Sequence, residues 1–178
     1  MVKHKEQRVG VFLDIQNLYH SAKNLYQARV NYQELLKKAV AGRKLIRAIA
    51  YVVKSETSEE LAFFEALEKF GIELRIKDLQ IYPDGTKKAD WDVGLAIDAV
   101  KLAPSLDVII LATGDGDFLP LVEYLKAIGK IVEIIAFSRT ASLRLKEEAD
   151  DFFDLEIEPE KFLIPFKPRR IKIKMIRK

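Results

Sequence analysis

The sequence contains no cysteine and only two histidines, His4 and His20. Without cysteine, the chain has no disulfide bonds and no thiolate metal site, as expected in a reducing compartment. Two isolated histidines also leave few nitrogen ligands for zinc. No apolar run approaches the roughly 20 residues needed to span a bilayer, and the first eight residues lack the apolar centre of a signal peptide. We therefore expect a soluble cytoplasmic protein with no membrane partner.

Charge is unevenly distributed along the 178 residues. Residues 167–178 hold seven of the 30 lysines and arginines and no acid, whereas the rest has 23 bases against 27 acids. A basic tail on an acidic body is typical of proteins whose tail binds a polyanion, and also of a solubilising terminus. Arg169, Arg170 and Lys172 are therefore candidate nucleic-acid-binding residues. We expect one folded domain over residues 1–158 and a basic tail over 159–178.

The tail also alternates apolar and basic residues from Ile171 to Ile176, a pattern that suits a short edge strand. Such a strand could pair with the same strand of a second copy, which would produce a homodimer.

Apolar runs and helical patterns alternate along the chain and predict an α/β fold. We expect strands over residues 8–14, 45–53, 72–76, 108–112 and 131–137, with a short last strand over 153–157. Helices are expected between them, over residues 31–42, 58–70, 90–102, 118–128 and 142–149. The connections are too long for hairpins, which indicates a mostly parallel sheet with helices on both faces. The strand order 3-2-1-4-5 would place the first and fourth strands side by side, with a ligand cleft between them.

Aspartates follow the ends of those two neighbouring strands. Asp14 ends the first strand, and Asp115 and Asp117 alternate with two glycines directly after the fourth. The glycines are expected to adopt backbone angles that other residues resist. Because parallel strands end at one edge of the sheet, these carboxylates should lie close together. Asp92, at the start of a helix that enters the same edge, is expected to join them.

Several carboxylates at one site need either raised pKa values or a balancing cation. Mg²⁺ and Mn²⁺ prefer oxygen ligands, so we predict a site for one of them formed by Asp14, Asp92, Asp115 and Asp117. A metal held this way suits hydrolysis of a phosphodiester with water as nucleophile. Asn17, one helical turn beyond Asp14, could orient a water or a phosphate through its amide.

Other residues near the predicted site could bind the nucleic-acid chain. Lys87 and Lys88 would bind flanking phosphates, and Trp91 would stack on a base. Each candidate has a structural alternative, because a lone tryptophan more often packs in the fold. Asp90 and Asp117 could equally cap the helices that follow them.

Taken together, three motifs resemble the NYN domain of the LabA-like group. They are Asp14-x-x-Asn17, Lys88-x-x-x-Asp92-Val-Gly-Leu-Ala-Ile-Asp98 and Thr113-Gly-Asp-Gly-Asp-Phe118. The resemblance continues through Ser138, Leu143 and Ala149-Asp-Asp-Phe152, and it covers about residues 8–157. The basic tail lies outside it.

This resemblance implies a PIN-like three-layer α/β/α fold and a Mg²⁺- or Mn²⁺-dependent ribonuclease. In the family's terms Asp14, Asp92 and Asp115 would be metal ligands, with Asn17 and Asp117 as their close support. The choice of RNA over DNA depends on the resemblance alone. The leading hypothesis is thus an endoribonuclease whose catalytic residues are Asp14, Asn17, Asp92, Asp115 and Asp117.

Two other functions remain open at this point. A regulatory module could keep the acidic pocket and bind RNA or a protein without cutting. A phosphatase could use Asp14 as an aspartyl nucleophile, although the second aspartate that such phosphatases carry two residues later is Gln16 here.

Overall fold

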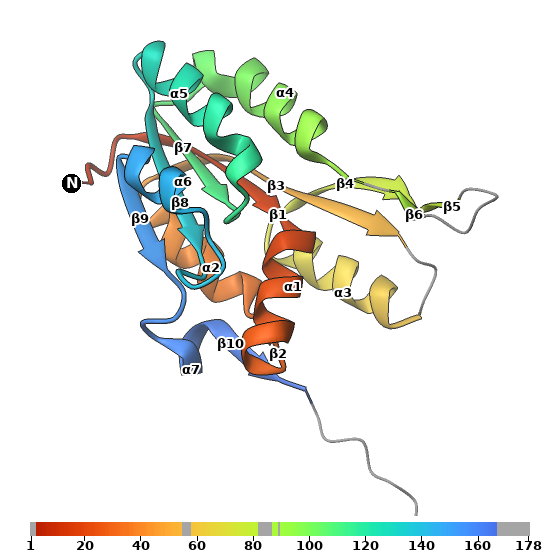
Figure 1. The fold of residues 1–178 in the computed structure, drawn as a ribbon. Coiled ribbons are helices and arrows are strands. Elements are labelled where there is room, and N and C mark those ends of the chain that lie inside the picture. The colour runs from red at the N-terminus through yellow and green to blue at the C-terminus, as the bar shows by residue number, and fades with distance from the viewer. Residues whose placement is uncertain (1–2, 55–57, 82–86, 89, 167–178) are drawn as a thin grey trace, which may run out of the picture.

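The computed structural model describes residues 3–54, 58–81, 87–88 and 90–166. At its centre is a parallel six-stranded sheet in the order β4-β3-β1-β7-β8-β9 (Figure 1). Its strands are β1 (Arg8–Asp14), β3 (Lys44–Lys54), β4 (Glu73–Asp78), β7 (Val108–Ala112), β8 (Ile131–Ala136) and β9 (Asp151–Asp154).

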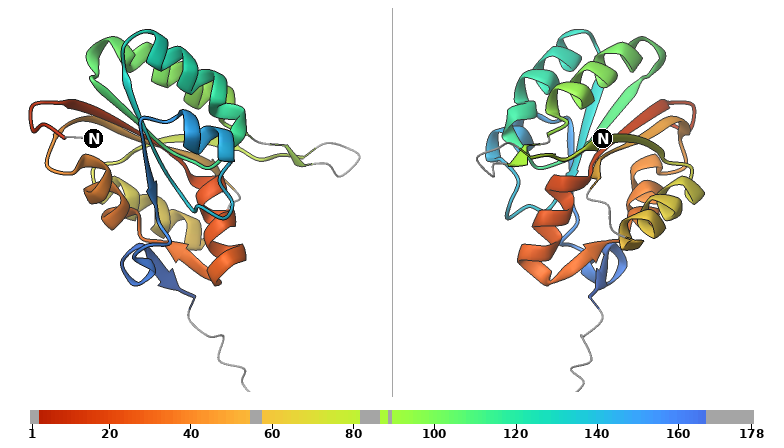
Figure 2. Two further views of the ribbon diagram at one scale, coloured as in Figure 1. Left: turned by 60° about the vertical axis from the view of Figure 1, so that its left-hand side comes forward. Right: turned by 90° about the vertical axis from the view of Figure 1, so that its right-hand side faces the viewer.

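Helices cover both faces of this sheet, as the two views of Figure 2 show. One face packs against α1 (Ile15–Tyr26), α2 (Tyr32–Val40), α3 (Ser58–Lys69) and the short α7 (Pro159–Phe162). The other packs against α4 (Asp92–Leu102), α5 (Leu119–Ala127) and α6 (Leu143–Glu148). Two 3-10 turns, η1 (Ala103–Ser105) and η2 (Gly116–Phe118), follow α4 and precede α5.

Two short antiparallel pairs lie outside the main sheet. β2 (Ala28–Val30) pairs with β10 (Leu163–Pro165), and β5 (Gln80–Ile81) pairs with β6 (Lys87–Lys88). The first pair joins the chain after α1 to the chain after α7. The folded part therefore runs at least to Pro165, beyond the domain boundary expected at residue 158.

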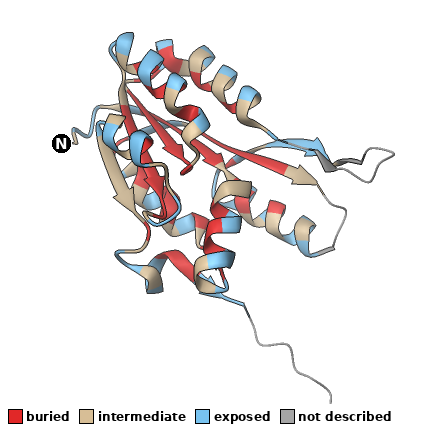
Figure 3. Ribbon diagram, viewed as in Figure 1, coloured by how far each residue is buried: buried red, intermediate tan, exposed pale blue. Residues whose placement is uncertain are grey.

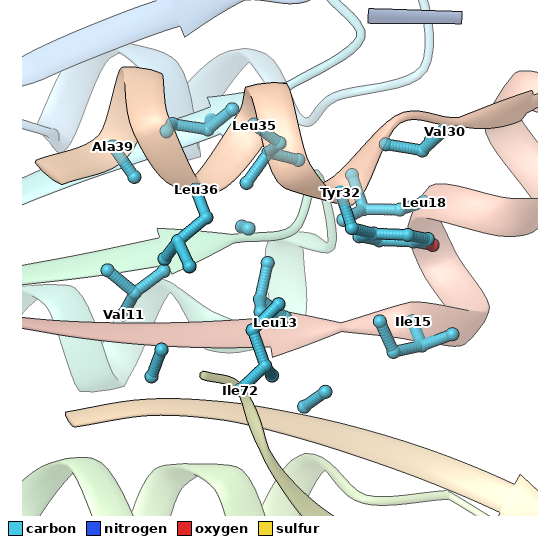
Figure 4. Close-up of a cluster of buried hydrophobic side chains, with 14 of the residues drawn as sticks. Val11, Leu13, Ile15, Leu18, Val30, Tyr32, Leu35, Leu36, Ala39 and Ile72 are labelled. Carbon is cyan, nitrogen blue, oxygen red and sulfur yellow. The ribbon is translucent and has the colours of Figure 1, made fainter. Parts of the chain in front are cut away.

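Alternating side chains along the central strands divide the core into two layers. In β1, Val11 and Leu13 face the layer under α1, α2 and α3, whereas Phe12 faces α4 and α5. All five residues of β7 are fully buried, as expected for a strand with helices on both sides. Figure 3 shows this burial along the central strands, and Figure 4 shows the first layer, where Leu13 lies near Leu36 of α2.

The predicted fold class is confirmed, and the five expected strands lie in the expected order. The order was incomplete, because β9 adds a sixth strand beside β8. β9 also begins and ends earlier than the 153–157 range expected for it. The sequence did not predict α1, although Asp14 at its N-cap accepts a hydrogen bond from the backbone N–H of Asn17 at 3.1 Å, a common helix-start signal.

Two expected helix caps differ from those in the structure. Trp91, and not Asp90, is the N-cap residue of α4, and it forms no side-chain cap. Asp117 does not cap α5 either, because the capping side chain at this turn is Asp115. The Asn31 cap of α2 is confirmed, since its side chain accepts from the backbone N–H of Glu34 at 3.3 Å. Among the described helices none is long and apolar enough to cross a membrane.

Candidate metal centre

The predicted acidic residues lie at the carboxyl edge of the sheet, at the starts of α1, α4 and α5. Asp14 ends β1 and caps α1, Asp92 is the first residue of α4, and Asp115 and Asp117 lie in the turn between β7 and α5. The N-terminal end of a helix carries partial positive charge, which favours carboxylates there. The fold therefore brings all four aspartates to one edge, as expected from the parallel strands.

Hydrogen bonds tie the end of β7 to the start of α1. Asp14 is central to this network, because its Oδ2 accepts from the Thr113 hydroxyl at 2.9 Å while its Oδ1 accepts from Asn17 N–H. The Thr113 Oγ1 in turn accepts from the backbone N–H of Asp115 at 3.2 Å. The Asn17 Oδ1 accepts from the backbone N–H of Gly114 at 2.9 Å. One oxygen of Asp14 thus caps α1, and the other positions the loop that carries Asp115 through Thr113.

The glycines of this loop are required for space and not for backbone angles. Neither Gly114 nor Gly116 has a positive φ, so the expectation of unusual angles was wrong. A Cβ atom on Gly114 would lie 2.9 Å from the Cα of Ala141, and one on Gly116 would lie 3.0 Å from the Oγ of Ser142. The loop before α6 therefore packs directly on the acidic loop. The sequence reasoning missed this contact, because nothing in the local pattern links segments about 27 residues apart.

Asp92, Asp115 and Asp117 form the acidic cluster of the site. One carboxylate oxygen from each lies within 4.8 Å of the others. Asp115 is also held in place, because its Oδ1 accepts from the backbone N–H of Asp117 at 3.0 Å. Within the described residues, no lysine or arginine forms an ion pair with any of the three. Their negative charge is therefore not balanced by that part of the chain.

Burial and mutual repulsion raise the pKa values of two of the four aspartates. Burial is the main cause of the raised pKa of Asp92, followed by the charges of Asp14 and Asp115. Burial also raises the pKa of Asp14, against the hydrogen bonds from Asn17 and Thr113 that lower it. Both carboxyl groups would be more stable beside a positive charge.

The residues of the cluster fit a hard divalent cation. Carboxylate oxygens are the ligands that Mg²⁺ and Mn²⁺ prefer, and such ions commonly keep several waters beside two or three protein oxygens. Neither histidine belongs to the cluster, which argues against zinc. Asp14 is not one of the three clustered carboxylates, and its two oxygens are already hydrogen-bonded.

Trp91, expected to stack on a base, is held by contacts within the fold. Its Nε1–H donates to the carbonyl oxygen of Val52 at 2.8 Å, and its ring meets Tyr51 edge-on at 5.5 Å. A Cβ atom on Gly94 would lie 2.5 Å from the indole, and the ammonium of Lys77 lies 4.6 Å from the ring centre. The close approach of the indole explains why residue 94 of α4 is a glycine. Base stacking by Trp91 stays a prediction.

The remaining candidate residues are not brought to the cluster by the described structure. Lys87 and Lys88 form β6, and their side chains lie outside the described part. The tail residues Arg169, Arg170 and Lys172 also lie outside the described residues. Asp98 of the resembling motif points elsewhere, since its carboxylate accepts from the Tyr51 hydroxyl at 3.0 Å.

A parallel α/β sheet with an acidic cluster at its carboxyl edge is the arrangement expected of a PIN-like domain. Residues 8–156 match the NYN domain family, and the chain belongs to that family. The resemblance to the NYN domain stated from the sequence is thereby confirmed. NYN domains are generally nucleases of the PIN-like type, a group that uses divalent metal ions.

Two known proteins are similar over most of the chain. The low amplitude and bright protein LabA of Synechococcus elongatus is 24% identical over 165 residues, which cover 85% of each protein. A crystal structure of a protein of unknown function from Vibrio parahaemolyticus is 30% identical, with a TM-score of 0.83. The match covers 92% of this chain and 100% of that one.

Proposed function

We propose that this protein is a ribonuclease that depends on Mg²⁺ or Mn²⁺ and hydrolyses RNA phosphodiester bonds at the cluster of Asp92, Asp115 and Asp117. The observation that carries the proposal is the convergence of three carboxylates within 4.8 Å, with no lysine or arginine paired to them among the described residues, at the sheet edge of an NYN domain. Such a cluster costs stability unless a cation balances it. A bound divalent cation would remove this cost.

Each residue of the site has a distinct role in this proposal. Asp92, Asp115 and Asp117 would hold the cation, and Asp14 would fix the loop through Thr113 and contribute negative charge behind the cluster. A divalent cation bound there would neutralise charge on the scissile phosphate and lower the pKa of an attacking water. The N-terminal ends of α1, α4 and α5 add backbone dipoles that favour an anionic phosphate.

In this proposal Asn17 would contact the substrate directly. Its Oδ1 is used by the N–H of Gly114, but its Nδ2 has no hydrogen-bond acceptor among the described residues. The amide is only partly buried, so this N–H₂ group faces accessible space. It can therefore donate to a phosphate oxygen or orient a water while the other end of the amide holds the loop.

The direct test is cleavage of an end-labelled RNA by purified protein with Mg²⁺, with Mn²⁺ or with EDTA. A DNA of the same sequence is included, because the preference for RNA follows from the family and not from the site. Cleavage should require the metal, and Asp115→Asn should lower the rate at least about 100-fold, since even residues that only support metal ligands contribute 10–100-fold. Asparagine can still cap η2, so this variant should keep the fold.

Asp78→Asn is the matched control, because Asp78 is an exposed aspartate of β4 outside the cluster. It should cleave at the wild-type rate. Equal cleavage by the Asp115→Asn variant would place the catalytic centre elsewhere. Absence of metal-dependent cleavage from a range of RNAs, with RNA binding retained, would instead favour a non-cutting regulatory module that uses the same pocket.

A further inference from the structure

An apolar groove begins at the acidic cluster and runs between α4 and α5. It has a volume of about 330 Å³, and Asp92 and Asp117 of the cluster form its mouth. Its walls are apolar or aromatic side chains from both helices: Val93, Ala96, Val100, Pro120, Leu121 and Tyr124. The groove and the cluster therefore share two residues and form one continuous surface.

The groove has exposed apolar residues at its rim and buried ones at its base. Val93 is 74% and Tyr124 48% exposed, whereas Leu121 is 7% exposed. Among the described residues that line the groove, Asp92 and Asp117 are the only charged ones. The groove thus offers no cation for a phosphate, and it suits an uncharged, flat group.

The position of the groove indicates which part of a nucleic acid would enter it. A phosphate bound through a cation at the cluster would have its own nucleoside attached within reach of the groove mouth. Tyr124 lies seven residues after Asp117, which is two helical turns or about 10 Å along the helix. A volume of about 330 Å³ is at the small end of known ligand sites, a size suited to a base with its sugar.

We propose that the α4–α5 groove binds the nucleobase next to the scissile phosphate, with the ring of Tyr124 as its stacking partner. This inference rests on the proposed nuclease function, because it is the RNA phosphate bound at the cluster that would bring a base to the groove. Stacking on an aromatic ring tolerates any base, since every base has a π-face. The groove therefore favours unpaired nucleotides over a duplex, in which the bases are already stacked.

The test compares adenosine 5′-monophosphate with ribose 5-phosphate, two ligands with the same phosphate and sugar that differ only in the base. Binding to the full-length protein with Mg²⁺ is measured by NMR titration, which does not require cleavage. Wild-type protein should bind the nucleotide more tightly than the sugar phosphate. Tyr124→Ala should weaken nucleotide binding about 5–150-fold, the range measured for losing one base–aromatic stack, and leave sugar phosphate binding unchanged.

Two further variants make this comparison specific. Tyr124→Phe keeps the ring and should bind the nucleotide almost as tightly as the wild type. Ile128→Ala removes another exposed apolar side chain, 45% exposed just after α5, that does not line the groove. It should change neither affinity. Equal weakening of both ligands by Tyr124→Ala, or no weakening of either, would overturn the proposal.

The outcomes separate this proposal from the nuclease function. Cleavage with no base effect at Tyr124 would leave the nuclease standing and remove the groove as a base site. A base effect without any RNA cleavage would keep the groove and refute the nuclease. A second copy of the chain could also occupy the groove, and sedimentation velocity of the wild type and of Tyr124→Ala tests this. If the wild type is a dimer, Tyr124→Ala is a monomer and nucleotide binding is unchanged, the groove is a dimer interface and base binding is overturned.

Discussion

The most informative stability prediction concerns the charge of the acidic cluster. Asp115→Asn should make the metal-free protein more stable, because it removes one of three like charges whose oxygens lie within 4.8 Å. Two unit charges 4.8 Å apart repel by about 0.9 kcal/mol in water and about 3.5 kcal/mol at an effective dielectric constant of 20. The substitution removes two of the three repulsive pairs, so the expected gain in a water-like dielectric is about 2 kcal/mol.

This gain should be visible in thermal unfolding. For a chain of 178 residues, each kcal/mol shifts the midpoint by roughly 2–4 °C. In EDTA and low salt the midpoint of the Asp115→Asn variant should therefore lie about 4–8 °C above that of the wild type. Added KCl should reduce the difference, because salt screens repulsion between accessible charges.

Metal should remove most of this difference. At a free Mg²⁺ or Mn²⁺ concentration 100 times the dissociation constant, binding stabilises the wild type by about 2.7 kcal/mol, or about 5–11 °C. If Asp115→Asn weakens metal binding 100-fold, the same metal concentration stabilises the variant by only about 0.4 kcal/mol. The Asp115→Asn midpoint should then rise by less than about 2 °C.

Scanning calorimetry or circular dichroism with Mg²⁺, Mn²⁺ or EDTA measures both effects, with ionic strength held constant by KCl. Asp78→Asn serves as the control and should follow the wild type throughout. The reasoning is refuted by equal metal-free midpoints for the wild type and Asp115→Asn. An equal rise of both midpoints with metal would also refute it, because the cation would then bind somewhere else.

Three further predictions concern the rest of the fold. Arg43 and Glu133 form a doubly hydrogen-bonded ion pair at 2.6 and 2.9 Å with side chains only 1% and 4% exposed. Glu133 also pairs with Lys3 at 3.1 Å, so Arg43→Met should lower the free energy of unfolding in urea by about 3 kcal/mol, the low end of the range for breaking a buried pair. Replacing both with apolar residues of similar volume should restore much of it, and a double variant as unstable as the single one would contradict this account. Hydrogen bonds from the side chain and the backbone N–H of Arg8 lower the pKa of Asp107 from 3.8 to about 2, so this carboxylate stabilises the fold above about pH 4 and loses that contribution as pH falls toward 2. The Arg8 and Asp107 side chains are 46% and 39% exposed, so the effect should be below about 1 kcal/mol, and acid unfolding of Asp107→Asn should lack that part of the pH dependence. Gly114→Ala should cost about 1–3 kcal/mol, because its Cβ would press on backbone that cannot easily move, and unchanged stability in urea would refute the tight contact.

The strands and the position of the acids could be predicted because they depend on local patterns. β7 is continuously apolar, which indicates a strand covered on both faces, and Asp14 and Asp115 directly follow strands that a parallel sheet brings together. The expected order 3-2-1-4-5 is what made these two strands neighbours. The pattern predicted a short last strand but gave neither its bounds nor its place beside β8, because β9 is only four residues long and partly exposed.

The finer structure of the site depends on contacts between distant segments. The role of Gly114 is set by Ala141, and the packing of Trp91 by Gly94 together with the carbonyl of Val52. Neither relation leaves a periodic signal in the sequence. The groove between α4 and α5 was also missed, since an exposed Tyr124 has the same local pattern as any surface residue of a helix.

The double use of the Asp14 carboxylate affects how variants of this protein should be interpreted. One oxygen caps α1, and the other accepts from Thr113 at the end of β7. This side chain therefore connects β1, on which it lies, to both β7 and the start of α1. A screen that scores only RNA cleavage would rank Asp14 as a catalytic residue even if its whole effect came from a displaced loop. Measured together, abundance and activity would separate the two, because Asp115→Asn should reduce activity alone whereas Asp14→Ala should reduce both.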